Sequence, residues 1–179
     1  TRTYYFILPL IVLAIFLYAM APGLFWRDSM EFCFLGFQLE IGHPAGSPTF
    51  SLLSKALSFL PLGSIAWRAN LLDVFGAVAA VILLAWATIQ WLLAARLVER
   101  TTATLIGAFT AATFAFSASF WQWSETAEVY SWQVAFLAGL LGLAGYAMRT
   151  EHDSRLPAAI GFLLGLSCGI HMAQILYAP

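Results

Sequence analysis

The segment WRDSMEFCFLGFQLEIGHPAGSP, from Trp26 to Pro48, is the polar stretch around which an otherwise apolar chain is arranged. It lies between a hydrophobic run that ends near Ala21 and another that starts near Trp67. Its acidic residues are Asp28, Glu31 and Glu40, and they stand close to a His-Pro pair. A polar, acidic loop held between two membrane spans is a suitable place for chemistry on an amphiphilic substrate.

The first two acids of this segment are spaced three residues apart. If the segment is helical, Asp28 and Glu31 lie on one face of the helix. Two interpretations stay open at this point. The carboxylates form a chemical site, or they are solvated loop charges and Asp28 caps the helix N-terminus.

The histidine of the segment stands in a proline-rich turn. Proline fixes its own φ and restricts the residue before it, so His43-Pro44 predicts a rigid turn. A histidine held in this way is oriented, which suits a hydrogen-bonding role. The residues that follow, from 48 to about 60, alternate apolar and polar side chains in the pattern of a helix lying in the membrane interface, ended by Pro61 and Gly63.

The composition indicates the protein class. Of 179 residues, 61% are hydrophobic and 9% are charged, whereas soluble domains carry about 25% charged residues. The chain is therefore predicted to be an all-α polytopic membrane protein. The net charge of −1 excludes a nucleic-acid-binding surface. Cys33 and Cys168 have neither zinc-site spacing nor a disulfide-framework pattern.

Five apolar stretches approach the roughly 20 residues that a helix needs to cross a bilayer. They cover residues 4–21, 67–95, 103–120, 132–148 and 156–178, with an outer loop of two short helices over 22–66. We interpret residues 1–179 as a single membrane domain. It is expected to be the N-terminal part of a longer protein.

Basic residues predict the orientation, because cytoplasmic loops are enriched in Lys and Arg. A cytoplasmic N-terminus places five arginines inside, namely Arg2, Arg96, Arg100, Arg149 and Arg155. The outer side then carries Arg27, Lys55 and Arg68 and five carboxylates, namely Asp28, Glu31, Glu40, Glu125 and Glu128. For a bacterial inner membrane, which is the expected location, that side is periplasmic.

Polar residues inside predicted spans are further candidates. Asn70 and Asp73 lie on one face near the outer end of the second span, where a buried carboxylate usually faces a cavity or a partner. The alternative for Asp73 is a structural pair with Arg68 or Lys55. His171 lies near the outer end of the last span and is expected to hydrogen-bond into the same cavity as Asp73, because a lone histidine is weak evidence for a metal or pigment ligand.

The second outer loop combines carboxylates with aromatic rings. Glu125 and Glu128 stand at helical spacing beside Trp121, Trp123, Tyr130 and Trp132. Most of these rings fit an interfacial aromatic belt. Carboxylates bordered by exposed rings are also what a sugar site needs, because the acids accept hydroxyl hydrogen bonds and the rings pack on the sugar.

Several short segments together resemble a known family. They are Asp28-Ser-x-Glu31, Gly42-His-Pro-x-Gly-x-Pro48, Leu60-Pro-Leu-Gly63, Arg68-x-Asn-Leu71, Ala115-Phe-Ser117 with Phe120-Trp121, Glu128-Val-Tyr130 and Gly165-Leu-x-x-Gly-x-His171. In this order they resemble the N-terminal signature of a branch of the GT-C membrane glycosyltransferases. That branch includes a vertebrate protein O-mannosyltransferase, and its bacterial members were long catalogued as a domain of unknown function.

The resemblance implies an inverting sugar transfer from a polyprenyl-phosphate-linked donor to an acceptor on the outer face of the membrane. It makes Asp28 the residue that acts as base or orients the acceptor, with Glu31 as its companion. His43, Lys55 and Arg68 are the groups expected to assist departure of the lipid phosphate. The remaining substrate-binding candidates are Asn70, Asp73, Glu125, Glu128, Tyr130 and His171.

The partners expected are the lipid bilayer, the lipid-linked donor and other membrane subunits. No metal ligands are predicted, and a divalent cation is the one cofactor left open. The alternative function is that of a non-catalytic relative that serves as a subunit of a transport, secretion or photosynthetic complex. A transporter is the third reading, and it is disfavoured because the sequence shows no inverted repeat or paired broken helices.

Overall fold

The apolar stretches fold into helices. The computed structural model describes residues 4–44, 46–150 and 153–177, and their regular structure is entirely helical. The elements in chain order are α1 (Tyr4–Ala19), α2 (Ser29–Gln38), α3 (Pro48–Ser58), α4 (Ile65–Ala94), α5 (Arg100–Ala115), α6 (Ala118–Trp123), α7 (Tyr130–Ala147), α8 (Leu156–Cys168) and the 3₁₀ helix η1 (Met172–Tyr177). The predicted all-α class is confirmed.

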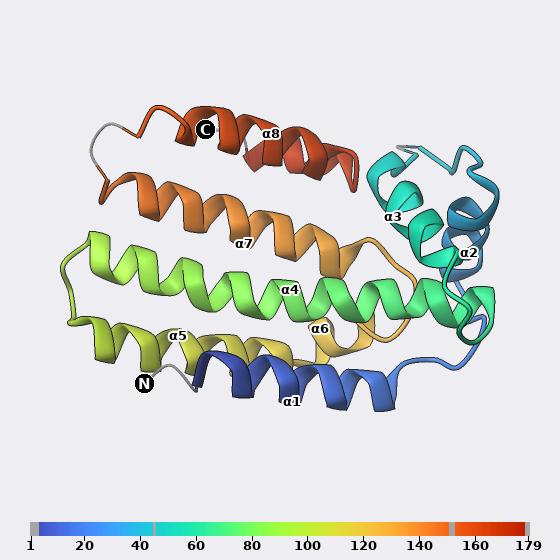
Figure 1. The fold of residues 1–179 in the computed structure, drawn as a ribbon, viewed down its shortest axis with the longest axis horizontal. Helices are drawn as coiled ribbons and strands as arrows, with labels where there is room; N and C mark the ends of the chain where they lie inside the picture. The colour runs from blue at the N-terminus through green and yellow to red at the C-terminus, as the bar shows by residue number, and fades with distance from the viewer. Residues whose placement is uncertain (1–3, 45, 151–152, 178–179) are drawn as a thin grey trace.

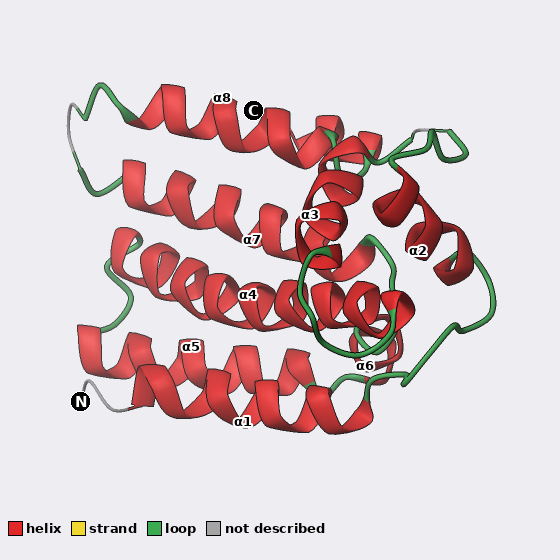
Figure 2. Ribbon diagram, turned by 45° about the vertical axis from the view of Figure 1, so that its right-hand side comes forward, coloured by secondary structure: helices red, strands yellow, loops and turns green. Residues whose placement is uncertain are grey.

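The long helices α1, α4, α5, α7 and α8 lie side by side, and α2 and α3 lie together at one end of them (Figure 1). The same end carries α6, and a turned view shows α2 and α3 beside the first turns of α4 (Figure 2). The central helix is α4, which packs most extensively on α7 and α5. The two short helices that the sequence predicts within residues 22–66 are present as α2 and α3.

Small residues let the central helices approach closely. Ala77 and Ala80 of α4 are fully buried in the main core, where they meet Val12 and Phe16 of α1. On α7, Gly142 leaves the space that the ring of Trp86 fills. A Cβ at Gly142 would collide with the ring of Trp86, so α4 and α7 are close-packed at this point.

Two predicted spans are interrupted. The stretch 103–120 divides into α5 and α6, because Ser117 is extended (φ −69°, ψ 140°) and its hydroxyl donates to the carbonyl of Phe114. The stretch 156–178 divides at Gly169, whose carbonyl accepts from the backbone N–H of Thr49 at 2.8 Å, while the Thr49 hydroxyl donates to the carbonyl of Leu166. The N-terminus of α3 thus satisfies the carbonyls that end α8.

The described residues give partial support for membrane crossing. Within them, α4 is the one helix that is both long and apolar enough to span a bilayer, and Ile7–Ala19 and Leu156–Cys168 are apolar but shorter. Large side chains such as Leu10, Phe109 and Phe162 are 62%, 74% and 70% exposed. Five spans stay a prediction. Arg2 and Ala178, which entered the predicted topology and last span, lie outside the described residues.

Candidate functional site

The acidic loops meet at one end of the molecule. The segments that join α1 to α2, α2 to α3 and α6 to α7 all lie at the end where α4 begins (Figure 1). This end, called the acidic end below, carries Asp28, Glu31, Glu40, Glu125 and Glu128. The arginines at 96, 100, 149 and 155 stand at the opposite ends of the long helices. Glu99 and Asp153 lie at those ends too, and the acidic end also carries Arg27, Lys55 and Arg68. The two ends thus differ in their excess of charge, and the predicted orientation in a membrane stays a prediction.

A second hydrophobic core supports the acidic end. It joins the two loop helices to the start of α4, to the segment before α7 and to the residue after α8. Phe32 of α2 and Phe50 of α3 meet there with ring centroids 5.2 Å apart, and Ile170 is fully buried against them. This core fixes the loop helices relative to the long helices.

Asn70 ties two loops to α4. Its Nδ2 donates to the carbonyls of Ala21 and Gly23 at 2.8 and 2.9 Å, and its Oδ1 accepts from the backbone N–H of Ala127 at 2.9 Å. The side chain is fully buried. The structure therefore gives Asn70 an architectural set of partners, while its predicted contact with substrate stays a prediction.

Asp73 anchors the start of α7. Its carboxylate accepts from the backbone N–H of Glu128 at 3.2 Å and from the hydroxyl of Ser131. The residue is fully buried. Its partners are thus these two groups, and the pairing with Arg68 or Lys55 considered from the sequence is not the one observed.

Glu31 and His43 form an ion pair across the turn between α2 and α3. Glu31 Oε1 accepts from the backbone N–H of His43 at 2.7 Å, and Glu31 Oε2 lies 2.8 Å from His43 Nδ1. The hydrogen bonds from His43 lower the pKa of the Glu31 carboxyl, and the hydrogen bond and charge of Glu31 raise the pKa of His43. Each partner therefore favours the charged form of the other.

Asp28 stands at the N-cap position of α2, but its side chain makes no capping hydrogen bond. The residue is exposed to solvent. Asp28 thus occupies the position of a helix cap, but its carboxylate does not bond to the helix N-terminus. That it forms part of a chemical site stays a prediction. A carboxylate of this kind can take a proton from a hydroxyl that comes within hydrogen-bond reach.

Comparison with known proteins identifies the family. Residues 28–179 match the family model described as the protein O-mannosyl-transferase TMEM260 N-terminal domain. The chain belongs to this family. It is 35% identical over 167 residues to the protein O-mannosyl-transferase TMEM260 of Mus musculus, an alignment that covers 89% of this chain and 22% of the relative. The chain thus spans about a fifth of that relative's length, and no solved structure matches it.

The part that matches the TMEM260 N-terminal domain begins at Asp28 and includes every site residue proposed from the sequence.

Glu128 is the most buried carboxyl of the acidic loops, at 3% exposure. Burial is the main cause that raises its pKa to about 7, and the charge of Asp28 acts in the same direction, while Arg27 and His43 oppose it. Glu128 therefore titrates near neutral pH.

We expect Glu128→Gln to stabilise the protein above about pH 7. In the unfolded chain Glu128 ionises near its ordinary value of 4.5, and in the folded protein near 7. The free energy of unfolding should therefore fall as pH rises between these values, because the folded state holds the proton longer. Solvent screening reduces the effect to about 1–2 kcal/mol. Unfolding measured at pH 5 and pH 8 should show a higher free energy of unfolding for Glu128→Gln than for wild type at pH 8 alone. An equal difference at both pH values would contradict the prediction.

Arg27 is a site neighbour that the sequence did not single out. Its guanidinium lies 5.4 Å from the ring centroid of Trp26 and 4.9 Å from that of Trp123. Its backbone is left-handed, with φ 68°. The ring of Trp123 comes from the end of α6, nearly a hundred residues away in the sequence, so its contact with Arg27 could not be placed from the sequence.

The two other cations predicted to bind phosphate have backbone partners. Lys55 Nζ donates to the carbonyl of Phe37 at 2.7 Å and lies over the rings of Phe37 and Phe59. Arg68 donates to the carbonyl of Leu60. Both contacts fasten the loop helices, so of the cationic groups proposed from the sequence, His43 is the one with a carboxylate partner and a half-exposed ring.

The remaining predicted residues lie around the same end. Tyr130 packs on Trp123 with ring centroids 4.8 Å apart, and burial raises the pKa of Glu125. The backbone carbonyl of Glu125 accepts from Ala21. His171 Nδ1 accepts from the backbone N–H of Ala173 at 3.2 Å, in the break after α8. Their contacts with substrate stay predictions.

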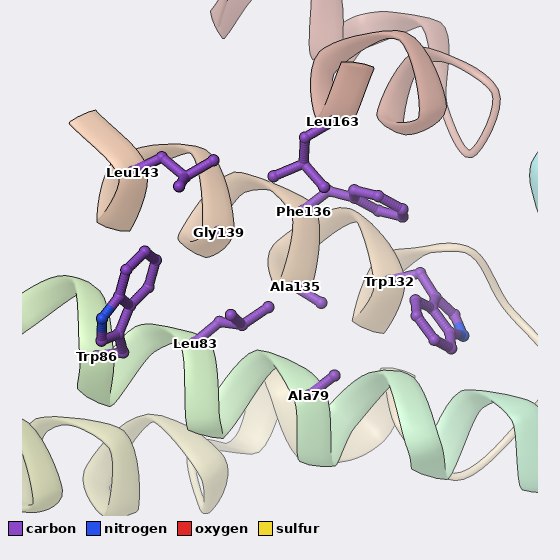
Figure 3. Close-up of a pocket in the computed structure, with 9 residues that line it drawn as sticks. All are labelled: Ala79, Leu83, Trp86, Trp132, Ala135, Phe136, Gly139, Leu143 and Leu163. Atoms are coloured by element: carbon purple, nitrogen blue, oxygen red, sulfur yellow. The ribbon is translucent and has the colours of Figure 1, made fainter. Parts of the chain in front are cut away.

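The two main cavities lie away from the carboxylates. One, of about 260 Å³, is wholly apolar and lies between α4, α7 and α8, with Trp86, Phe136 and Leu163 on its walls (Figure 3). The other, of about 660 Å³, lies between α1, α4 and α5 near Arg100. Among the described residues no group of three acidic, His or Cys side chains is placed to hold a metal ion.

Proposed function

We propose that this chain forms the acceptor-activating part of a membrane glycosyltransferase that moves a sugar from a polyprenyl-phosphate donor to a hydroxyl group. The observation that carries the proposal is the free carboxylate of Asp28 beside the Glu31–His43 pair, in a chain of the TMEM260 N-terminal domain family. The name of the mouse relative favours mannose as the sugar and a protein hydroxyl as the acceptor.

The reaction is a single displacement. Asp28 takes the proton of the acceptor hydroxyl as its oxygen forms a bond to the anomeric carbon of the sugar. The bond between that carbon and the phosphate oxygen breaks at the same time, and its electron pair leaves with the lipid phosphate. Attack from the side opposite the leaving group inverts the anomeric centre. The charge that develops on the phosphate requires a cationic donor.

The fold supports a membrane setting for this reaction. Exposed side chains such as Leu10, Phe109 and Phe162 surround the long helices, and soluble proteins rarely expose apolar surface so extensively. The charge separation along the helices favours the acidic end as the outer one. A donor lipid would then lie along the helices with its phosphate at the depth of the acidic loops.

A transfer assay with the full-length protein in lipid vesicles tests the proposal. We expect mannose to move from polyprenyl-phosphate mannose to a peptide that contains Ser and Thr, and not from a nucleotide-activated mannose. The second donor is the matched control, because it carries the same sugar without the lipid phosphate. Transfer from the nucleotide donor would contradict the lipid-linked proposal. Transfer from neither, with stable partner proteins copurifying, would favour the non-catalytic subunit.

A further inference from the structure

The imidazole of His43 is held from several sides. Glu31 accepts from both its backbone N–H and Nδ1. The carbonyl of His43 accepts from the N–H of Gly46 at 2.7 Å, which closes the turn. The ring of Phe32 stands edge-on to the imidazole with centroids 6.1 Å apart. The ring therefore has a defined orientation although its side chain is 50% exposed.

This arrangement assigns different tasks to the two ring nitrogens. Nδ1 carries a proton, since it lies 2.8 Å from a carboxylate oxygen. Among the described residues Nε2 has no hydrogen-bond partner, so in the imidazolium form its N–H is available to a ligand. An imidazolium N–H to a phosphate oxygen is a charge-assisted hydrogen bond, which is stronger than a neutral one.

The turn is shaped to keep Glu31 in place. A Cβ added to Gly42 would lie 2.6 Å from Leu35 Cδ1 and 3.1 Å from Glu31 Oε1. Glycine at this position thus lets the chain pass directly beside the Glu31 carboxylate. The Glu31–His43 contact therefore depends on this close backbone packing as well as on charge.

We infer that Glu31 is a positioning residue that holds His43 as the binding group for the phosphate of the lipid-linked donor. Asp28 then acts without a second catalytic carboxylate. This inference rests on the proposed function and revises the part that the family resemblance gave to Glu31. Lys55 and Arg68 each donate to a backbone carbonyl, which makes His43 the first candidate to test among the three predicted phosphate-binding groups.

The surrounding charges favour the imidazolium. The groups that act on His43 electrostatically are Glu31, Asp28 and Glu128, and all three raise its pKa. The stabilisation gained from the protonated ring is present below its ordinary value of 6.5 and is lost as pH rises through the raised pKa. Phosphate binding should follow the same dependence and weaken in alkaline solution.

Binding of farnesyl phosphate to the full-length protein in detergent tests the inference, with farnesol as the control that lacks phosphate. We expect His43→Gln to weaken farnesyl phosphate binding about tenfold at pH 6.5 and to leave farnesol binding unchanged. Glu31→Gln should bind nearly as wild type at pH 5.5, where the ring is protonated without help, and about fivefold more weakly at pH 8. His43→Lys should restore much of the binding at pH 8.

The variants separate the inference from the proposed function. Asp28→Asn should keep farnesyl phosphate affinity within about twofold while losing transfer, because it removes the base and not the phosphate contact. If Glu31→Gln binds farnesyl phosphate as wild type at both pH values but loses transfer, Glu31 is a second catalytic carboxylate and the inference fails. If His43→Gln also binds as wild type, there is no phosphate site at His43. Loss of binding by His43→Gln together with full transfer by Asp28→Asn would overturn the proposed function and leave the phosphate site standing.

Discussion

Asp28→Asn should reduce sugar transfer by about 10²- to 10⁴-fold, the range that a positioned general base contributes. Asparagine keeps the size and most of the shape of the side chain, but its amide cannot accept the proton of the acceptor hydroxyl. Because Asp28 is exposed and makes no capping hydrogen bond, the free energy of unfolding should change by no more than about 0.5 kcal/mol. The measurement is transfer from polyprenyl-phosphate mannose in vesicles, with an unfolding curve for each variant.

Glu40→Gln is the matched control for this experiment. Glu40 is an exposed carboxylate of the same acidic loop, so its neutralisation changes the loop charge by the same amount. It lies after α2, on the far side of that helix from its N-terminus. We expect transfer by Glu40→Gln within about twofold of wild type. Equal losses in both variants would mean that the loop charge matters and that Asp28 is not the base.

The helices were predictable because the signals that determine them lie within each segment of the sequence. Apolar runs of about 20 residues and the turn residues around His43-Pro44 determine where helices begin and end, and α1, α4 and α7 lie within two residues of the predicted bounds at each end. The break at Ser117 was missed, because it depends on a hydroxyl that bonds to its own helix. Nothing in the hydrophobic pattern of residues 103–120 marks it.

The sequence predicted which residues could form the site, but not which of them contact each other. Proximity of Asp28 and Glu31 follows from helical spacing, and a carboxylate inside a span, such as Asp73, signals a required partner. The partners themselves come from distant chain positions. The Glu31–His43 contact joins the first turn of α2 to the turn that follows this helix, twelve positions along the chain. The partners of Asp73 are a backbone N–H and a serine hydroxyl. Such contacts leave no periodic signal in one sequence.

Asn70 shows most clearly how a polar residue of a span can hold the site together. Its amide binds both the loop that leads to Asp28 and the loop that carries Glu128, through the carbonyls of Ala21 and Gly23 and the N–H of Ala127. No neighbouring side chain duplicates these bonds among the described residues. The Asn70 amide is therefore a main tie between the two loops. The backbone hydrogen bond from Ala21 to Glu125 and the hydrogen bond from the Glu128 N–H to Asp73 add to it.

We expect Asn70→Ala to destabilise the protein by about 3 kcal/mol, because it leaves two partly buried carbonyls and one buried N–H without their partner. Thr88→Ala is the control on the same helix, since the Thr88 hydroxyl donates within α4 to the carbonyl of Leu84 and its loss should cost about 1 kcal/mol or less. Unfolding in detergent and hydrogen exchange at the Ala127 amide measure the two consequences. In Asn70→Ala, the Ala127 amide should exchange faster and the protein should be less stable. In Thr88→Ala, exchange at Ala127 should stay as in the wild type. Similar stability of both variants with unchanged protection of Ala127 would show that the loops are held by the hydrophobic core around Phe32 and Ile170 and not by the amide.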